Sequence, residues 1–392
     1  MKQFTSINQR STSMKRSILT MLFAVSVFYT GCKKDETTSS PTGSVTVSGI
    51  ARTFGGQPIA NASVQFFSGN AVAGTPAATA TSNASGEWQL GLNASGRYTY
   101  VVAAASFPTA IVTVNIPTGQ TTVNLGVTTL ASQTIQGIVN DAQTGAPIAN
   151  AVVRFFSGAN NDTSGYRFAD RITNSAGAWT SSFTIGSYVG AIYAANRVPL
   201  VTNVPVTDTT TRQVTTTITQ PVPLGQMRIV LNWGRVPSDL DSHLTGDSTS
   251  ASGRPRYHVY YANEMVRAAN GDTIAFLDHD DVTAFGPETI TIFRFFPGTL
   301  RYKIHDYSNR NTVGSHYMSD SSTAIARVYT SAGLIREDRI RTGVAGNQWY
   351  AYDINGATQQ ITLVNSIRDS VSNPADPSFR PTALPPKAVS GK

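Results

Sequence analysis

Short runs of alternating hydrophobic and polar residues recur along most of the chain, and they predict β-strands. The segments 44–48 (SVTVS) and 111–115 (IVTVN) are two clear examples of this two-residue period. No long segment shows the 3.6-residue period of an amphipathic helix, and turn sequences such as Asn355-Gly356 separate the runs. Because side chains alternate between the two faces of a strand, the pattern predicts an all-β protein made of half-buried strands.

An internal repeat divides the first half of the chain into two similar units. The segment GQPIANASVQFFSG at 56–69 recurs as GAPIANAVVRFFSG at 145–158, and SNASGEW at 82–88 recurs in register as TNSAGAW at 173–179. Such a repeat marks two copies of one structural unit. We expect the copies to span residues 45–130 and 133–222. In both copies the tryptophan (Trp88, Trp179) is expected to fill a core, and the glycine (Gly86, Gly177) to take a positive φ in a turn.

Each copy resembles the carboxypeptidase-regulatory-like domain. The resemblance is carried by the opening Gly49-Ile50 or Gly137-Ile138, by the Gly-x-Pro-Ile-x-x-Ala-x-Val segment, and by the Gly-x-Trp turn. It implies two tandem transthyretin/prealbumin-like β-sandwiches, which in this family are appendages without catalytic residues. The family's usual Thr-Asp turn has no Asp here, so a metal or polar role for that residue is absent.

A linker at 220–225 (QPVPLG) opens a third region, which we expect to form a third β-sandwich over residues 225–366. This region resembles the YfaP-type domain of bacterial surface and secreted proteins. The matching segments are LNW at 231–233, PSDLDSHL at 237–244, DHDD at 278–281, GPETI at 286–290 and PGTLRY at 297–302. The resemblance implies a β-sandwich and says little about function.

The third region also contains all five histidines and the densest group of acids, and three interpretations of them remain open. In the first, two acidic turns supply oxygen ligands to a calcium ion that staples the domain. In the second, the acids only cap turns and the histidines are scattered strand residues. In the third, a zinc hydrolase uses His243, His258 or His305 with an Asp. The candidate calcium ligands are Asp239, Asp241, Asp278, Asp280 and Glu288.

Known catalytic signatures are missing from the sequence. It contains no His-Glu-x-x-His, no Gly-x-Ser-x-Gly, no P-loop and no dinucleotide-binding fingerprint. We therefore predict that the protein is not an enzyme. A hydrolase that acts on a glycan or a peptide through the Asp/His set of the C-terminal domain is the alternative.

The first residues of the chain predict a location in the cell envelope. Two positive residues precede the apolar segment 18–28, which is too short to span a bilayer. The following Tyr29-Thr30-Gly31-Cys32 resembles the lipobox of bacterial lipoproteins, with Tyr29 in place of the usual aliphatic residue. The resemblance implies that residues 1–31 form a signal peptide and that the single cysteine, Cys32, is lipidated.

The residues after the cysteine refine this prediction. Lys33-Lys34-Asp35-Glu36 resembles the signal that follows the lipidated cysteine in surface lipoproteins of the Bacteroidetes. It implies a lipidated tether over residues 32–44 and a location on the exposed face of the outer membrane. At the other end, the Ser/Pro-rich segment 367–392 is expected to be a disordered tail.

Charge limits the choice of partners. The formal net charge is +7, and the predicted signal peptide carries four positive residues and no acid, so the mature chain has about +3. No stripe of Lys and Arg follows the signal peptide, so we predict no nucleic-acid partner. We predict a non-catalytic surface-binding or structural lipoprotein. Its expected partners are the membrane, through the anchor, and a polysaccharide or an envelope protein.

Overall fold

The computed structural model describes residues 45–168, 170–247 and 256–369. Over these residues the chain is almost entirely β-strand, and the one helical element is the short π-helical turn η1 (Tyr317–Ser321). The prediction of an all-β fold is confirmed. The expected signal peptide, Cys32, the tether, and the tail beyond Asp369 lie outside the described residues.

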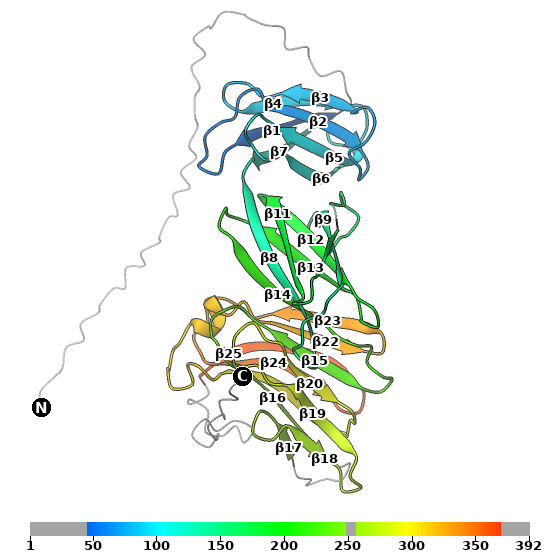
Figure 1. The fold of residues 1–392 in the computed structure, drawn as a ribbon, viewed down its shortest axis with the longest axis vertical. Helices are drawn as coiled ribbons and strands as arrows, with labels where there is room; N and C mark the ends of the chain where they lie inside the picture. Colours follow the sequence, from blue (N-terminus) through cyan, green and yellow to red (C-terminus); the bar gives the residue numbers. More distant parts are fainter. Residues whose placement is uncertain (1–44, 169, 248–255, 370–392) are drawn as a thin grey trace, which may run out of the picture. The chain divides into compact units, whose positions relative to one another are not determined.

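The first group of strands forms two sheets that face each other across a shared core (Figure 1). One sheet has the order β4-β1-β7 and the other β3-β2-β5-β6. Buried side chains such as Val47 and Phe66 enter the core from opposite sheets. The bounds are β1 (Val45–Arg52), β2 (Ser63–Ser68), β3 (Ala78–Thr81), β4 (Glu87–Leu92), β5 (Gly96–Ala103), β6 (Ala110–Ile116) and β7 (Thr122–Thr129).

The second group repeats this topology strand for strand. Its sheets have the orders β11-β8-β14 and β10-β9-β12-β13, and the first and last strands pair in parallel, β8 with β14 as β1 with β7. The sequence repeat is therefore a repeat of the fold. The bounds are β8 (Ser132–Asp141), β9 (Val152–Ser157), β10 (Arg171–Ile172), β11 (Ala178–Thr184), β12 (Gly186–Tyr193), β13 (Leu200–Val206) and β14 (Arg212–Ile218).

The third group is a larger sandwich with sheets of six and five strands, ordered β18-β19-β20-β15-β22-β23 and β17-β16-β21-β24-β25. The last strand ends at Arg368, two residues into the expected tail, because Arg368 pairs with Gln348. The bounds are β15 (Met227–Asn232), β16 (Leu240–Asp247), β17 (Arg256–Val259), β18 (Met265–Arg267), β19 (Thr273–His279), β20 (Glu288–Ile292), β21 (Thr299–Asp306), β22 (Ile325–Thr330), β23 (Gly333–Arg339), β24 (Gln348–Asn355) and β25 (Ile361–Arg368).

In the first sheet of both repeats, a glycine and a tryptophan are paired on neighbouring strands. Gly49 is paired with Trp88, and Gly137 with Trp179. Both tryptophans are buried, at 3% and 7% exposure, as the sequence predicts for core residues. The predicted turn glycines also have positive φ, +77° at Gly86 and +67° at Gly177.

A buried hydroxyl that follows β10 in the second copy and β3 in the first bonds the loop before the neighbouring strand of the same sheet. In the second copy, Thr173 Oγ1 accepts from the Ala151 N–H at 2.8 Å and donates to the Ile148 carbonyl at 2.7 Å. Ser82 makes the equivalent pair of bonds in the first copy. One side chain therefore satisfies two backbone groups away from water.

We expect Thr173→Val to destabilise the second sandwich by about 2 kcal/mol, because it leaves a buried N–H and a buried C=O without this partner. Urea unfolding would measure the change. The matched control is Thr180→Val on the exposed side of the neighbouring strand, where we expect a change within about 0.5 kcal/mol. Equal losses in the two variants would contradict a role for the Thr173 hydroxyl.

The second and third sandwiches are joined by a small apolar cluster and by hydrogen bonds. The Arg228 guanidinium, on β15, donates to Thr219 Oγ1 at 2.7 Å and to the Gln220 carbonyl at 3.1 Å. Thr217 Oγ1 donates to Asn232 Oδ1 at 2.6 Å. Buried residues from both sides pack together at this junction: Ala142, Val222, Val230 and Tyr329.

Candidate metal centre

Strand β16 presents two potential metal ligands on one face. Leu240 and Leu244 enter the core of the third sandwich, and the Ser242 hydroxyl bonds the buried Tyr302 hydroxyl at 2.8 Å. Because side chains alternate along a strand, Asp241 and His243 share the opposite face. Both are buried, at 0% and 1% exposure. The sequence pattern Asp-x-His therefore places a carboxylate and an imidazole side by side.

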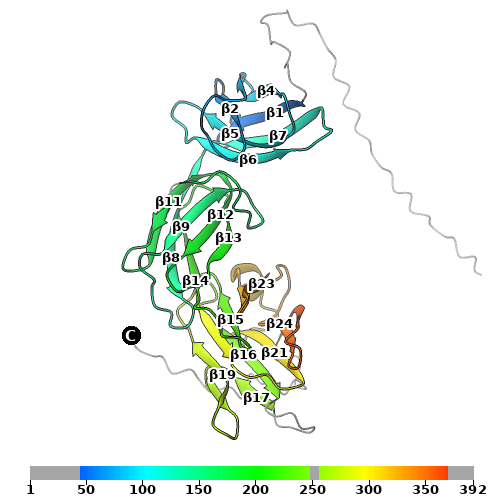
Figure 2. The ribbon, with the colours of Figure 1, turned by 90° about the vertical axis from the view of Figure 1, so that its right-hand side faces the viewer.

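The neighbouring strand β21, which lies beside β16 in Figure 2, adds a second histidine. His305 lies directly opposite Asp241 in the antiparallel register, and its side chain is also fully buried. Its Nδ1 atom is 4.0 Å from Asp241 Oδ2. Asp241 and His305 are 64 positions apart in the sequence, and the pairing of β16 with β21 brings them together.

The opposite sheet contributes two further acids. Glu288 is the first residue of β20, is fully buried, and accepts a 2.6 Å hydrogen bond from the Ser242 backbone N–H through Oε2. Asp280 follows β19 and is half-buried. Glu288 thus reaches from one sheet to a strand of the other, next to Asp241.

Together these residues form two ligand triads that share Asp241. One triad is Asp241, His243 and His305, and the other is Asp241, Asp280 and Glu288. Within each triad the potential ligand atoms all lie within 4.8 Å of one another. That spacing suits a single ion in contact with three side chains, since metal–ligand bonds of 2.0–2.6 Å place neighbouring ligands closer than about 5 Å.

A hydrogen bond orients the first histidine. His243 Nδ1 and His258 Nε2 are 2.8 Å apart, and the His258 ring stacks on Tyr260 at a centroid distance of 4.2 Å. A partner on one ring nitrogen fixes the tautomer and aims the other nitrogen, which is the usual arrangement around a metal-bound histidine. His258 is therefore placed to support His243.

The three carboxylates impose an electrostatic cost that a cation would reverse. Two charged carboxylate oxygens within 4.8 Å of each other repel by about 3 kcal/mol or more at an effective dielectric constant of 20. Lys303, buried at 2% exposure beside the ring of Tyr350, adds a positive charge on β21 that the sequence analysis did not single out. Lysines are rarely buried, so its position in a strand gave no signal.

Two of the five acids predicted as calcium ligands lie outside both triads. Asp278 accepts a hydrogen bond from Thr291 Oγ1 at 2.5 Å, and burial raises its pKa. β19 ends at His279 and carries a bulge there, so strict alternation stops before Asp280 and does not place Asp278 and Asp280 on one face.

Asp239 precedes β16 and lies near Asp306. Its backbone N–H donates to Ser308 Oγ at 3.0 Å. Burial, with a smaller contribution from the Asp239 charge, raises the pKa of Asp306 to about 6. Only three of the five predicted acids therefore converge, and two of the three histidines proposed for zinc, His243 and His305, converge with them.

The remaining two histidines are separate from the centre. His279 lies against Gly145 of the second sandwich, where an added Cβ would be 2.4 Å from its Nε2 atom. His316 is exposed and pairs with Asp320 at 3.3 Å.

Comparisons with known proteins were made on the whole chain. No protein-family model matches it, and no curated protein does. Among solved structures, the Bacillus anthracis TIE protein is 11% identical, with 66% of this chain and 45% of that chain covered and a TM-score of 0.23. GBS52, the minor pilin of Streptococcus agalactiae, is 14% identical, with 46% and 98% covered and a TM-score of 0.24.

A third solved structure is hydroxyquinol 1,2-dioxygenase from Pseudomonas putida DLL-E4, at 12% identity, 23% and 57% coverage and a TM-score of 0.19. This chain thus spans less than half of the TIE protein and little more than half of the dioxygenase. Likenesses at these scores carry no argument about function. Within the described part of the chain, none of the helical structure is long and apolar enough to cross a membrane.

Proposed function

We propose that this chain is a non-catalytic cell-envelope lipoprotein whose C-terminal sandwich is stabilised by a divalent metal ion bound at Asp241. The observation that carries the proposal is the convergence of two histidines and three acids, from both sheets, on that one buried carboxylate. The three acids do not come from one loop, so a bound ion would connect β16, β20, β21 and the end of β19. Its role would be to hold the two sheets together.

The donor set favours a transition-metal ion in the first triad. Imidazole nitrogens suit zinc and similar ions, whereas calcium prefers six to eight oxygens. The triad of Asp241, His243 and His305 is therefore a zinc-type site. The triad of Asp241, Asp280 and Glu288 offers oxygen ligands only, and calcium remains the candidate there.

Burial supports a structural role over the hydrolase alternative. Asp241, His305 and Glu288 have no exposed surface, and His243 is 1% exposed. A catalytic zinc keeps a position open for water and substrate, whereas a structural ion is enclosed by protein. An ion at this depth is enclosed.

The envelope setting rests on sequence resemblances. From the lipobox-like segment that ends at Cys32, we propose a lipid anchor in the outer membrane, with the chain exposed at the surface. In that setting the two repeated sandwiches, as carboxypeptidase-regulatory-like modules, would be non-catalytic spacers, and the YfaP-like third domain would be the functional part. A lipid anchor with more than one acyl chain holds a protein stably in a membrane.

A polysaccharide or an envelope protein is the proposed partner of the third domain. Three half-buried tyrosines support it as a contact surface: Tyr261 packs edge-on against Tyr260 at 5.2 Å and against Tyr307 at 5.6 Å. Rings with one covered and one accessible side are suited to amphipathic ligands such as sugars. A glycan screen with the mature protein tests this part, and binding that survives Tyr261→Ala and Tyr307→Ala would place the contact elsewhere.

The metal proposal is tested by elemental analysis of the mature protein, expressed without the lipid anchor and dialysed against zinc, manganese or calcium. We expect at least one tightly held metal ion per chain. Asp241→Asn should lose it, because Asp241 belongs to both triads.

The matched control is Asp353→Asn, an acid of the same domain paired with the exposed Arg301 at 3.5 Å. It should keep the full metal content. A wild-type protein that retains no ion from any of the three solutions would overturn the proposal.

A further inference from the structure

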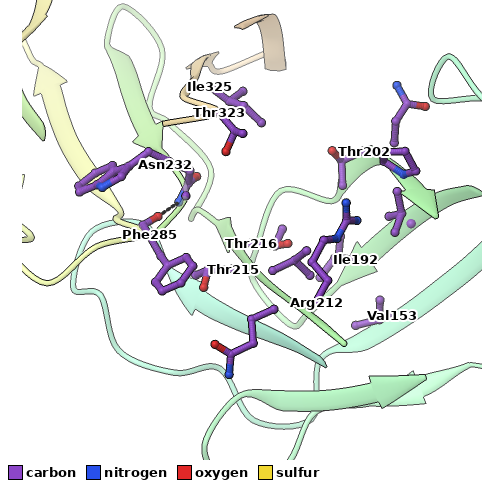
Figure 3. A pocket seen from close by; sticks show the side chains of 18 of the residues that line it. Val153, Ile192, Thr202, Arg212, Thr215, Thr216, Asn232, Phe285, Thr323 and Ile325 are labelled. Atoms are coloured by element: carbon purple, nitrogen blue, oxygen red, sulfur yellow. Dashed lines mark hydrogen bonds between the residues drawn. The ribbon is translucent and has the colours of Figure 1, made fainter. Parts of the chain in front are cut away.

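A cavity of about 350 Å³ lies where the second sandwich meets the third, separate from the metal centre (Figure 3). It opens at the seam between β13 and β14. These are the edge strands of two different sheets, so no hydrogen-bonded ladder closes the gap between them. Core residues of the second sandwich therefore line the cavity from this side, and the third sandwich forms the facing wall.

The walls of the cavity are largely apolar. On the side of the second sandwich, Val153, Ile192 and the rings of Phe155 and Trp179 line it. Phe285 and Ile325 face them from the third sandwich (Figure 3), together with Trp233. A space of this size holds roughly a dozen water molecules at 30 Å³ each, and apolar walls of this kind are typical of small-molecule sites.

The charged residues in the wall are all arginines. Arg327 and Arg339 both already pair with Glu337, at 2.7 and 3.5 Å. Arg212 differs from them, because its buried Nε atom has no hydrogen-bond partner in the described part of the chain. The nearby Asp208 accepts from Gln133 and Thr210, and its charge interacts with Arg212 without a hydrogen bond to the Nε atom.

Neutral polar groups complete the site around Arg212. Thr202, Thr215 and Thr216 line the cavity beside it, and the Asn232 side chain amide donates to the Phe285 carbonyl at 3.4 Å on the far wall (Figure 3). No acid lines the cavity among the described residues. The wall thus offers one guanidinium with hydrogen-bonding capacity, flanking hydroxyls and a large apolar surface.

We propose that this cavity binds a small amphipathic anion, an aliphatic carboxylate of about ten carbons, with its carboxylate on Arg212 and its chain against Val153, Phe155 and Trp179. A guanidinium binds a carboxylate through charge-assisted hydrogen bonds. The alkyl chain would pack against the core residues of the second sandwich that line the cavity. Free fatty acids, such as those released by lipid hydrolysis, have this chemistry.

The test is calorimetric titration of decanoate into the mature protein without its lipid anchor, with tryptophan fluorescence followed in parallel because Trp179 and Trp233 line the cavity. We expect one decanoate per chain and a change in fluorescence. Decan-1-ol, which has the same chain without the charge, should bind about tenfold more weakly or worse.

Two variants locate the site. Arg212→Gln should weaken decanoate binding about tenfold or more, and Thr202→Trp, at a half-buried position in the wall, should block the cavity without altering Arg212. Arg167→Gln, which changes an exposed arginine of the same sandwich outside the cavity, should leave binding unchanged.

No binding of decanoate would overturn the proposal, as would binding that persists in both Arg212→Gln and Thr202→Trp. Equal binding of decan-1-ol would overturn the choice of an anionic ligand. The result does not depend on the metal centre, because Asp241→Asn leaves every residue of the cavity wall in place and should bind decanoate as the wild type does.

Discussion

Excess EDTA should remove the proposed metal ion and lower the melting temperature of the C-terminal sandwich by about 10 °C. A ligand present at a hundredfold excess over its dissociation constant and bound only to the folded state adds about 2.7 kcal/mol. For a domain of this size, 1 kcal/mol shifts the melting temperature by about 4 °C. Scanning calorimetry of the mature chain, in EDTA and again after metal is restored, measures the change.

The Asp241→Asn variant should change its order of stability relative to the wild type when the metal is removed. With metal present, the wild type should be the more stable protein, because the variant has lost the carboxylate shared by both triads. In EDTA the order should reverse or vanish, because the amide no longer repels the nearby carboxylates of Asp280 and Glu288. A residue with an ordinary structural role would not change order with the metal.

The controls for this experiment lie in the same domain. His305→Gln should lose the metal response, whereas His316→Gln, at an exposed histidine paired with Asp320, should keep it. A wild-type melting temperature that is the same in EDTA, zinc, manganese and calcium would contradict a structural ion. The acids would then be explained by their hydrogen bonds and turns alone.

Gly137→Ala should destabilise the second sandwich by about 3 kcal/mol or more. An added Cβ would lie 2.0 to 2.2 Å from three atoms of the Trp179 indole, far inside van der Waals contact. The ring is buried and packs on Phe155 at a centroid distance of 5.0 Å, so it has little room to move. Overpacking of a filled core costs this much because neighbours must leave their preferred rotamers.

Hydrogen exchange in β8 and β11 would report the loss in this sandwich. Gly49→Ala should do the same in the first copy, where the Cβ would lie 2.4 Å from Trp88. The control is Gly55→Ala, where the nearest atom is 3.9 Å away.

Replacing Trp179 by Phe should relieve part of the clash in the second copy. The double variant Gly137→Ala/Trp179→Phe should therefore lose less stability than the sum of the losses of the two single variants. Additive losses would contradict direct contact.

The sequence predicted the fold class and the repeat because both depend on local patterns. Period-two alternation follows from the geometry of a strand, whatever its neighbours are. Gly86 and Gly177 are readable because only glycine takes a positive φ in such turns at little cost. The structural requirement for glycine at Gly49 and Gly137 could not be predicted, because it depends on a tryptophan that strand pairing places opposite them.

For the metal centre, the local order Asp241-Ser242-His243 was enough to place two ligands on one face of a strand. Only the tertiary structure decided the rest. The register of β16 against β21 set His305 opposite Asp241, Glu288 arrived from the other sheet, and the end of β19 separated Asp278 from Asp280. Contacts between residues far apart in sequence depend on which strands pair and in what register, and a pattern of single residues does not specify that.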